Sequence, residues 1–133
     1  MALAAEGVRL AVTARRRQRL DELASEIEGA GALRPIVIEQ DLMSSDAAQR
    51  IAEQAIAAFG KIEILVNNAG GSRAFKLHAS EEHWEEALTL KFTRHRQLTD
   101  RLLDPMVANR RGRIIDITGA VIPVHGGLRR YQF

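Results

Sequence analysis

The feature of this 133-residue chain that most limits its fold is a regular alternation of short β-rich runs and longer amphipathic segments. In the longer segments, apolar residues recur three and four positions apart, which is the period of a helix. Strands joined by helices of about 12 or more residues form parallel sheets through right-handed crossovers. We therefore expect an α/β fold with strands at residues 8–13, 35–39, 62–66 and 114–118.

The first two helical segments are marked by their apolar stripes and by glycines at their ends. One stripe runs from Leu20 to Ile27 and stops at Gly29-Ala30-Gly31, because glycine readily adopts the left-handed conformation that ends helices. The other runs from about Ser45 to Phe59, and Gly60 closes it. Both segments are long enough to cover one face of a sheet.

The third helical segment is the longest. It is expected to begin after Ser80, a predicted N-cap, and to continue to about Asn109. Pro105 should bend or interrupt it, since proline removes a hydrogen bond inside a helix. The stripe expected to face the core consists of Trp84, Ala87, Leu88, Leu98 and Leu102.

We expect one domain over residues 1–133, because the chain has no repeats, low-complexity tracts or long linkers. Residues 119–133 lack periodicity and are expected to form an irregular tail. No apolar run approaches the roughly 18 residues of a membrane-spanning helix, and the first six residues lack the basic start of a secretory leader. A cytoplasmic location is therefore expected. Because the chain has no Cys, disulfides, a thiolate metal site and a cysteine nucleophile are excluded.

Charge and histidine patterns argue against two further kinds of function. Lys and Arg number 19 against 17 acidic residues, for a net charge of +2. Nucleic-acid-binding domains usually carry a larger excess of bases, with aromatic residues among them for stacking. The four histidines do not form a metal-ligand motif. We therefore expect neither a nucleic-acid partner nor a metal site.

Polar and small residues follow each predicted strand. Ligands of open parallel sheets bind in the crevice beyond the carboxyl ends of the strands, so these residues are the first candidates for a site. They are Ala14-Arg15-Arg16, Asp41-Leu42, Asn67-Asn68-Ala69-Gly70 and Thr118-Gly119.

The segment Asn67-Asn68-Ala69-Gly70, in its context, closely resembles the short-chain dehydrogenase/reductase family. It follows the strand-like Ile-Glu-Ile-Leu-Val and precedes a long helix and the run at residues 112–118. The resemblance extends from residue 1 to about Thr118. It implies a Rossmann-like, doubly wound parallel sheet that is incomplete, with about four parallel strands and the first family strand missing. It also implies hydride transfer between a nicotinamide and the carbonyl or alcohol group of a small molecule.

NADP is the cofactor that the resemblance implies. Arg15, with Arg16 beside it, stands where NADP-preferring members place a guanidinium against the 2′-phosphate, and a guanidinium can bind phosphate through two hydrogen bonds. Asp41, followed by Leu42, matches the residue that bonds the adenine amino group. Asn67, Asn68, Ala69 and Gly70 match the turn beside the adenine ribose. The alternative for the arginines is a solvated run at the start of a helix.

The resemblance also suggests two catalytic residues. Tyr131 lies about where the family has its acid–base tyrosine, and Thr118 lies one residue before the position of the family's serine. The alternatives are a tail residue for Tyr131 and an ordinary strand-end residue for Thr118. The lysine that lowers the pKa of the tyrosine would be residue 135, beyond Phe133. Lys91 stands at the family's asparagine position, and either its amine reaches the strand ends or its stem lies along the protein with the amine in water.

The chain departs from the family in having no Gly-rich turn to hold a pyrophosphate, and residues 1–7 resemble the end of the helix that follows that turn. Two functions therefore stay open. One is an NADP(H)-dependent short-chain oxidoreductase, and the other is an inactive module with a binding or assembly role, or with none. The resemblance further implies a homo-oligomer formed through the long helix at residues 81–109.

In the strand order of this fold, 3-2-1-4-5, the missing strand belongs between residues 8–13 and 62–66. We predict that these two segments pair directly in a four-stranded parallel sheet. Otherwise, an open slot of about two strand spacings should destabilise the domain. Placement of the two strands in separate sheets would argue against the family assignment.

Overall fold

The fold is that of a computed structural model, in which residues 1–70, 80–117 and 120–124 are described. The predicted alternation of strands and helices is confirmed, and the bounds of the four predicted strands shift by no more than three residues. The helices are α1 (Ala2–Ala5), α2 (Arg17–Gly29), α3 (Ala47–Phe59), α4 (Glu81–Leu88), the π-helical turn η1 (Thr89–Thr93) and α5 (Arg94–Ala108). The strands are β1 (Ala11–Ala14), β2 (Ile36–Glu39), β3 (Ile64–Asn67), β4 (Gly112–Asp116) and β5 (Ala120–Val124).

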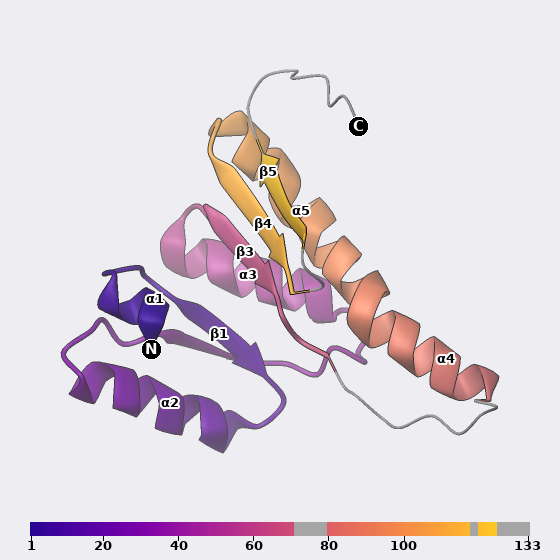
Figure 1. The fold of residues 1–133 in the computed structure, drawn as a ribbon, viewed down its shortest axis with the longest axis horizontal. Coiled ribbons are helices and arrows are strands. Elements are labelled where there is room, and N and C mark those ends of the chain that lie inside the picture. The colour runs from indigo at the N-terminus through magenta and orange to yellow at the C-terminus, as the bar shows by residue number, and fades with distance from the viewer. Residues whose placement is uncertain (71–79, 118–119, 125–133) are drawn as a thin grey trace.

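The strands form two sheets (Figure 1). In the first sheet β1 pairs with β2 in parallel, and in the second β3 pairs with β4 in parallel. The α/β class with parallel strands is therefore confirmed. The predicted direct pairing of residues 8–13 with residues 62–66 is wrong, because the corresponding strands, β1 and β3, lie in different sheets.

The second sheet also contains β5, which pairs with β4 in antiparallel orientation. Residues 119–133 were expected to be irregular, so this expectation is wrong for residues 120–124. The run Ala-Val-Ile-Pro-Val has no period that separates a strand from an apolar loop, and pairing with β4 decides its conformation. The remaining part of the predicted tail lies outside the described residues.

A shared apolar core connects the two sheets despite the lack of a hydrogen-bonded ladder between them. Ile38 of β2, Leu65 of β3 and Ile114 of β4 are buried in one cluster with residues of α3 and α5. From the helices, the cluster contains Ala48, Ile51, Ala52, Ala55, Leu98, Leu102 and Met106. Helix α2 packs on β1 and β2 and buries Leu20, Ala24 and Ile27.

Strand β3 has one buried face and one exposed face. Leu65 and Asn67 are buried, whereas Ile64 and Val66 are exposed. A near-continuous apolar run such as residues 62–66 is typical of a strand buried on both faces, but only one face of β3 is buried. Strand β3 pairs with a described neighbour on one edge only, and the core formed with α3 and α5 covers the face of Leu65.

The long helical segment is continuous but contains one wider turn. At η1 the backbone N–H of Arg94 donates to the carbonyl of Thr89, five residues earlier, in place of the usual four. Pro105 lies inside α5 without ending it, so the predicted interruption is wrong. Ser80 caps α4 as predicted, because its Oγ accepts a hydrogen bond from the backbone N–H of His83.

The predicted inward stripe of this segment is correct only for α5. Leu98 and Leu102 are buried, whereas Trp84 and Leu88 are 52% and 55% exposed. In Figure 1, α4 projects beyond the ends of the strands, so neither of the two described sheets covers it. The wider turn also changes the angular relation between α4 and α5, so one helical period does not describe both.

Candidate functional site

The carboxyl ends of the parallel strands lie together within each sheet. Ala14 is opposite Glu39 at the ends of β1 and β2, and Asn67 is opposite Asp116 at the ends of β3 and β4. The predicted segments that follow β1, β2 and β3 therefore start from these ends. Thr118 and Tyr131, the two predicted catalytic residues, lie outside the described residues, as does Gly119.

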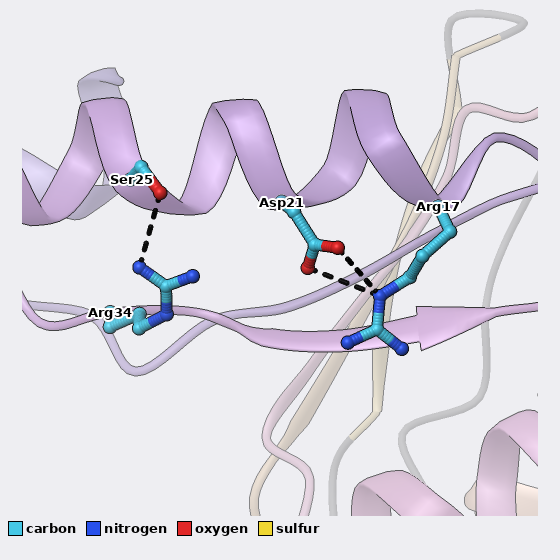
Figure 2. Close-up of polar contacts among 4 residues, drawn as sticks. All are labelled: Arg17, Asp21, Ser25 and Arg34. Atoms are coloured by element: carbon cyan, nitrogen blue, oxygen red, sulfur yellow. Dashed lines mark hydrogen bonds and ion pairs between the residues drawn. The ribbon is translucent and has the colours of Figure 1, made fainter.

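The arginine run after β1 divides into two pairs. Within α2, the Arg17 guanidinium Nε lies 2.9 and 3.1 Å from the two carboxylate oxygens of Asp21 (Figure 2). This hydrogen bond is the main cause that raises the pKa of Arg17 above its ordinary value. Arg19 lies 3.8 Å from the carboxylate of Glu22. Arg15 and Arg16 are exposed, and neither guanidinium bonds to another described residue.

The outer side of α2 is connected to the segment before β2. The Arg34 guanidinium Nη1 donates to Oγ of Ser25 at 3.3 Å, as Figure 2 shows, and to the carboxylate of Glu28 at 2.7 Å. These contacts are exposed and lie within the first sheet and its helix. They join α2, whose first turn follows Arg15 and Arg16, to the segment before β2.

Hydrogen bonds within the loop after β2, and others from α5, fix the conformation of this loop. Asp41 Oδ1 accepts a hydrogen bond from the backbone N–H of Met43 at 2.9 Å. From α5, the Arg94 guanidinium donates to the carbonyl of Leu42 at 2.9 Å and to that of Met43 at 3.3 Å. The side chain of Leu42, a predicted cofactor residue, packs against the apolar core.

Asn67 joins β3, β4 and α5. It is only 5% exposed, and its Nδ2 donates to Oδ1 of Asp116 at 2.9 Å and to Oγ1 of Thr99 at 3.3 Å. Its Oδ1 is buried and has no partner among the described residues. Within the predicted segment at residues 67–70, Asn67 is buried and bonded to the neighbouring elements, whereas Asn68, Ala69 and Gly70 are exposed.

Lys91 lies beside the end of β3. Its Cγ is 3.9 Å from the position that a Cβ on Gly70 would take, so the stem of the side chain passes the turn after β3. The residue as a whole is exposed. This placement agrees with a stem that lies along the protein and an amine in water.

Arg94 is the residue of this region that the sequence analysis missed. Arg94, Leu98, Leu102 and Met106 follow one another at intervals of four, and the last three are buried. An arginine on a core-facing stripe must find acceptors, because an unpaired buried charge is costly. The spacing to Leu98 and Leu102 could have identified it.

At the opposite end of the strands of the second sheet, Glu63 contacts two cationic side chains. Lys61 Nζ lies 3.1 Å and Arg111 Nε 3.4 Å from its carboxylate. The hydrogen bond from Lys61 is the main cause that lowers the pKa of Glu63 below its ordinary value. These charges lie at the amino ends of β3 and β4, away from the candidate site.

Among residues 1–70, 80–117 and 120–124, no group of three or more His, Cys, Asp or Glu side chains is arranged to hold a metal ion. No helix within these ranges is long and apolar enough to cross a membrane.

Comparisons with known proteins agree with the resemblance found in the sequence. The family model described as short chain dehydrogenase matches residues 1–126. A 3-oxoacyl-[acyl-carrier-protein] reductase FabG of Thermotoga maritima is 28% identical over 112 residues, which is 83% of this chain and 44% of that protein. The chain thus spans about half the length of the curated relatives that it matches.

Two solved structures show the same arrangement of elements. A metagenomic short-chain oxidoreductase in complex with NADP has a TM-score of 0.79 and 31% identity, over 86% of this chain and 52% of that one. A 7 alpha-hydroxysteroid dehydrogenase complexed with NADH has a TM-score of 0.80 and 25% identity, over 86% and 44%. Placement of β1 and β3 in separate sheets is therefore compatible with this fold. The expectation that such a placement would argue against the family assignment is wrong. The shared core around α3 and α5 connects both sheets without a ladder between β1 and β3.

Proposed function

The chain belongs to the short chain dehydrogenase family, and on that premise we propose that it holds NADP(H) along the carboxyl ends of β1, β2 and β3. The reaction proposed for the protein is hydride transfer between the nicotinamide and the carbonyl or alcohol group of a small molecule. The nicotinamide supplies the hydride or accepts it. What this chain contributes in the described residues is recognition of the adenosine end of the cofactor.

The observation that carries the proposal is the division of the arginine run. Arg17 and Arg19 are engaged by acidic residues of α2, whereas the side chains of Arg15 and Arg16, directly after β1, bond to no other described residue. Guanidinium groups stay charged at any working pH and bind phosphate through paired hydrogen bonds. Arg15 and Arg16 are therefore the proposed partners of the 2′-phosphate that distinguishes NADP from NAD.

The other described residues fit the adenosine end of the cofactor and not its pyrophosphate. Asp41 has Oδ1 engaged by Met43, and its Oδ2 is the proposed acceptor for the adenine amino group. Asn68, Ala69 and Gly70 form an exposed, irregular segment of small or polar residues after β3. Among the described helices, none begins at a Gly-rich turn whose amides would hold a pyrophosphate.

Thr118 and Tyr131 are the proposed hydroxyl-bearing residues at the reacting end. A tyrosine has an ordinary pKa of about 10, so proton transfer by Tyr131 near neutrality needs a neighbouring cation. Sequence position and the family resemblance support these two residues. A cytoplasmic location belongs to the same proposal.

Titration with NADPH and NADH, followed by fluorescence, tests the cofactor site. We expect saturable NADPH binding with a Kd below about 100 μM, or roughly −5.5 kcal/mol. Arg15→Ala should weaken NADPH binding by about tenfold and leave NADH binding unchanged, because only NADPH carries the 2′-phosphate. Arg19→Ala is the matched control from the same run, since Arg19 is paired with Glu22. Equal losses for both cofactors in Arg15→Ala would contradict the assignment.

A second function is favoured by the edges of β1 and β3 that pair with no other described strand. These edges lie at the middle of the family's sheet order, and Ile64 and Val66 of β3 are exposed. The corresponding proposal is a catalytically inactive module with a role in binding or assembly. The same titration separates the two functions, because a chain that binds neither cofactor at millimolar concentration supports the inactive module.

A further inference from the structure

Arg94 is a charged residue on the core-facing stripe of α5, and three acceptors surround its guanidinium. Its Nε and Nη2 donate to the carbonyls of Leu42 and Met43, and its Nη1 donates to Oε1 of Gln97 at 2.9 Å. The residue is half-buried. Charge-assisted hydrogen bonds of this kind are stronger than those between neutral groups. The guanidinium is therefore well placed to hold the loop after β2 against α5.

The position of Arg94 follows from the wider helical turn that precedes it. Its own backbone N–H closes η1 by donating to the carbonyl of Thr89. From there, Arg94 begins the stripe that continues through Leu98 and Leu102 into the core. The side chain thus leaves α5 on the face toward the sheets, where the loop after β2 passes.

The same helix also contacts the end of β3. Thr99, five residues after Arg94, accepts the hydrogen bond from Asn67, the last residue of β3. Helix α5 therefore bonds to the carboxyl end of β3 through Thr99 and to the loop after β2 through Arg94. Because no ladder joins the two sheets, these side-chain bonds and the apolar core determine how the two strand ends lie relative to each other.

We propose that Arg94 is a positioning residue that fixes the loop at residues 41–43 relative to the end of β3 and so controls how tightly the adenosine end of the dinucleotide is held. This inference rests on the proposed function. Arg94 itself touches no part of the cofactor in the proposal. It acts through the backbone of Leu42 and Met43, and through them on Asp41, whose Oδ1 caps the Met43 amide.

Binding of the two halves of the cofactor tests the role of Arg94. The probes are NADPH, adenosine 2′,5′-bisphosphate and reduced nicotinamide mononucleotide. Arg94→Gln should weaken binding of NADPH and of the bisphosphate by about tenfold, because two charge-assisted bonds to the loop are lost. Binding of the mononucleotide should not change. Arg94→Lys should restore part of the loss, since an ammonium retains the charge and reaches one carbonyl.

Arg96→Gln is the matched control, because Arg96 lies on the same helix and pairs with Asp100 one turn later. It should bind all three probes as the wild-type chain does. If Arg94 had only a structural role, Arg94→Gln would instead weaken binding of both halves of the cofactor and lower the unfolding temperature. Unchanged binding of the bisphosphate by Arg94→Gln overturns the proposal.

Amide hydrogen exchange, measured without any ligand, distinguishes failure of the role proposed for Arg94 from failure of the proposed function. The Met43 and Ser44 amides, which bond to Asp41, should exchange faster in Arg94→Gln than in Arg96→Gln. Unchanged exchange overturns the fixing of the loop by Arg94, whether or not NADPH binds. Failure of the wild-type chain to bind NADPH overturns the proposed function and, with it, the cofactor role of Arg94.

Discussion

Single polar residues at the strand ends of this protein have different tasks, although they are neighbours in the sequence. Asn67 and Asn68 illustrate this, because the first is 5% exposed and bonds to β4 and α5, while the second is exposed. Alternation along the strand turns one side chain into the core and the next one out of it. The buried amide thereby serves the fold, and the exposed one is available to a ligand.

Asn67→Ala should destabilise the fold by about 1–3 kcal/mol, because the half-buried Asp116 and Thr99 acceptors lose their donor. Denaturation by urea measures the change in the free energy of unfolding. Asn68→Ala is the matched control and should change it by less than about 0.5 kcal/mol. Equal effects of the two substitutions would contradict the structural role of Asn67.

Close packing between elements depends on glycine where α5 meets β4. A Cβ on Gly112 would lie 2.7 Å from Cβ of Met106 and 2.8 Å from its Sδ, and Met106 is fully buried. Gly112 thus allows the first residue of β4 to pass directly under the last turns of α5. Other glycines have conformational tasks instead, such as Gly60, whose φ of +74° ends α3.

Gly112→Ala should destabilise the protein by about 1–3 kcal/mol, since the added methyl group overlaps Met106 and forces α5 and β4 apart. Thermal unfolding followed by circular dichroism measures the effect. Gly29→Ala, at the end of α2, is the control, because a Cβ there meets nothing within 4 Å. It should be neutral or slightly stabilising, as alanine favours helix. A neutral Gly112→Ala would show that the packing at this position is looser than the structure indicates.

At the scale of the whole molecule, the long segment formed by α4, η1 and α5 carries a row of exposed apolar side chains. Leu88 and Phe92 are four residues apart and are 55% and 62% exposed, and Trp84 precedes them by another four. Exposed apolar stripes on a helix are common at contacts between protein chains. This surface is the proposed contact between two copies of the chain.

Phe92→Glu should weaken self-association at least tenfold, because a charge at the centre of an apolar contact must be desolvated. Sedimentation velocity over a range of concentrations measures it. Val107→Ser, which removes an exposed apolar side chain near the end of α5, is the control and should leave association unchanged. Association that persists in Phe92→Glu would assign it to another surface, such as the edges of β1 and β3 that have no partner among the described strands. A wild-type chain that stays monomeric would contradict the proposed contact.

The sequence alone determined the features that depend on neighbours along the chain. Apolar periodicity located α2, α3 and α5, and local signals at Gly60 and Ser80 marked the end of α3 and the start of α4. The motif at residues 67–70 identified the family, because its residue types and spacing are written in the chain itself. These features need no knowledge of which segments meet in space.

Tertiary structure decided the features that depend on contacts between distant segments. The separation of β1 from β3, the pairing of residues 120–124 with β4 and the exposure of Trp84 and Leu88 were each predicted incorrectly. Strand pairing is a choice among edges, and burial of a helix depends on whether a sheet lies under it, so neither is present in local periodicity. Arg94 belongs to the same class, because two of its three acceptors are the carbonyls of Leu42 and Met43, more than 50 residues away along the chain.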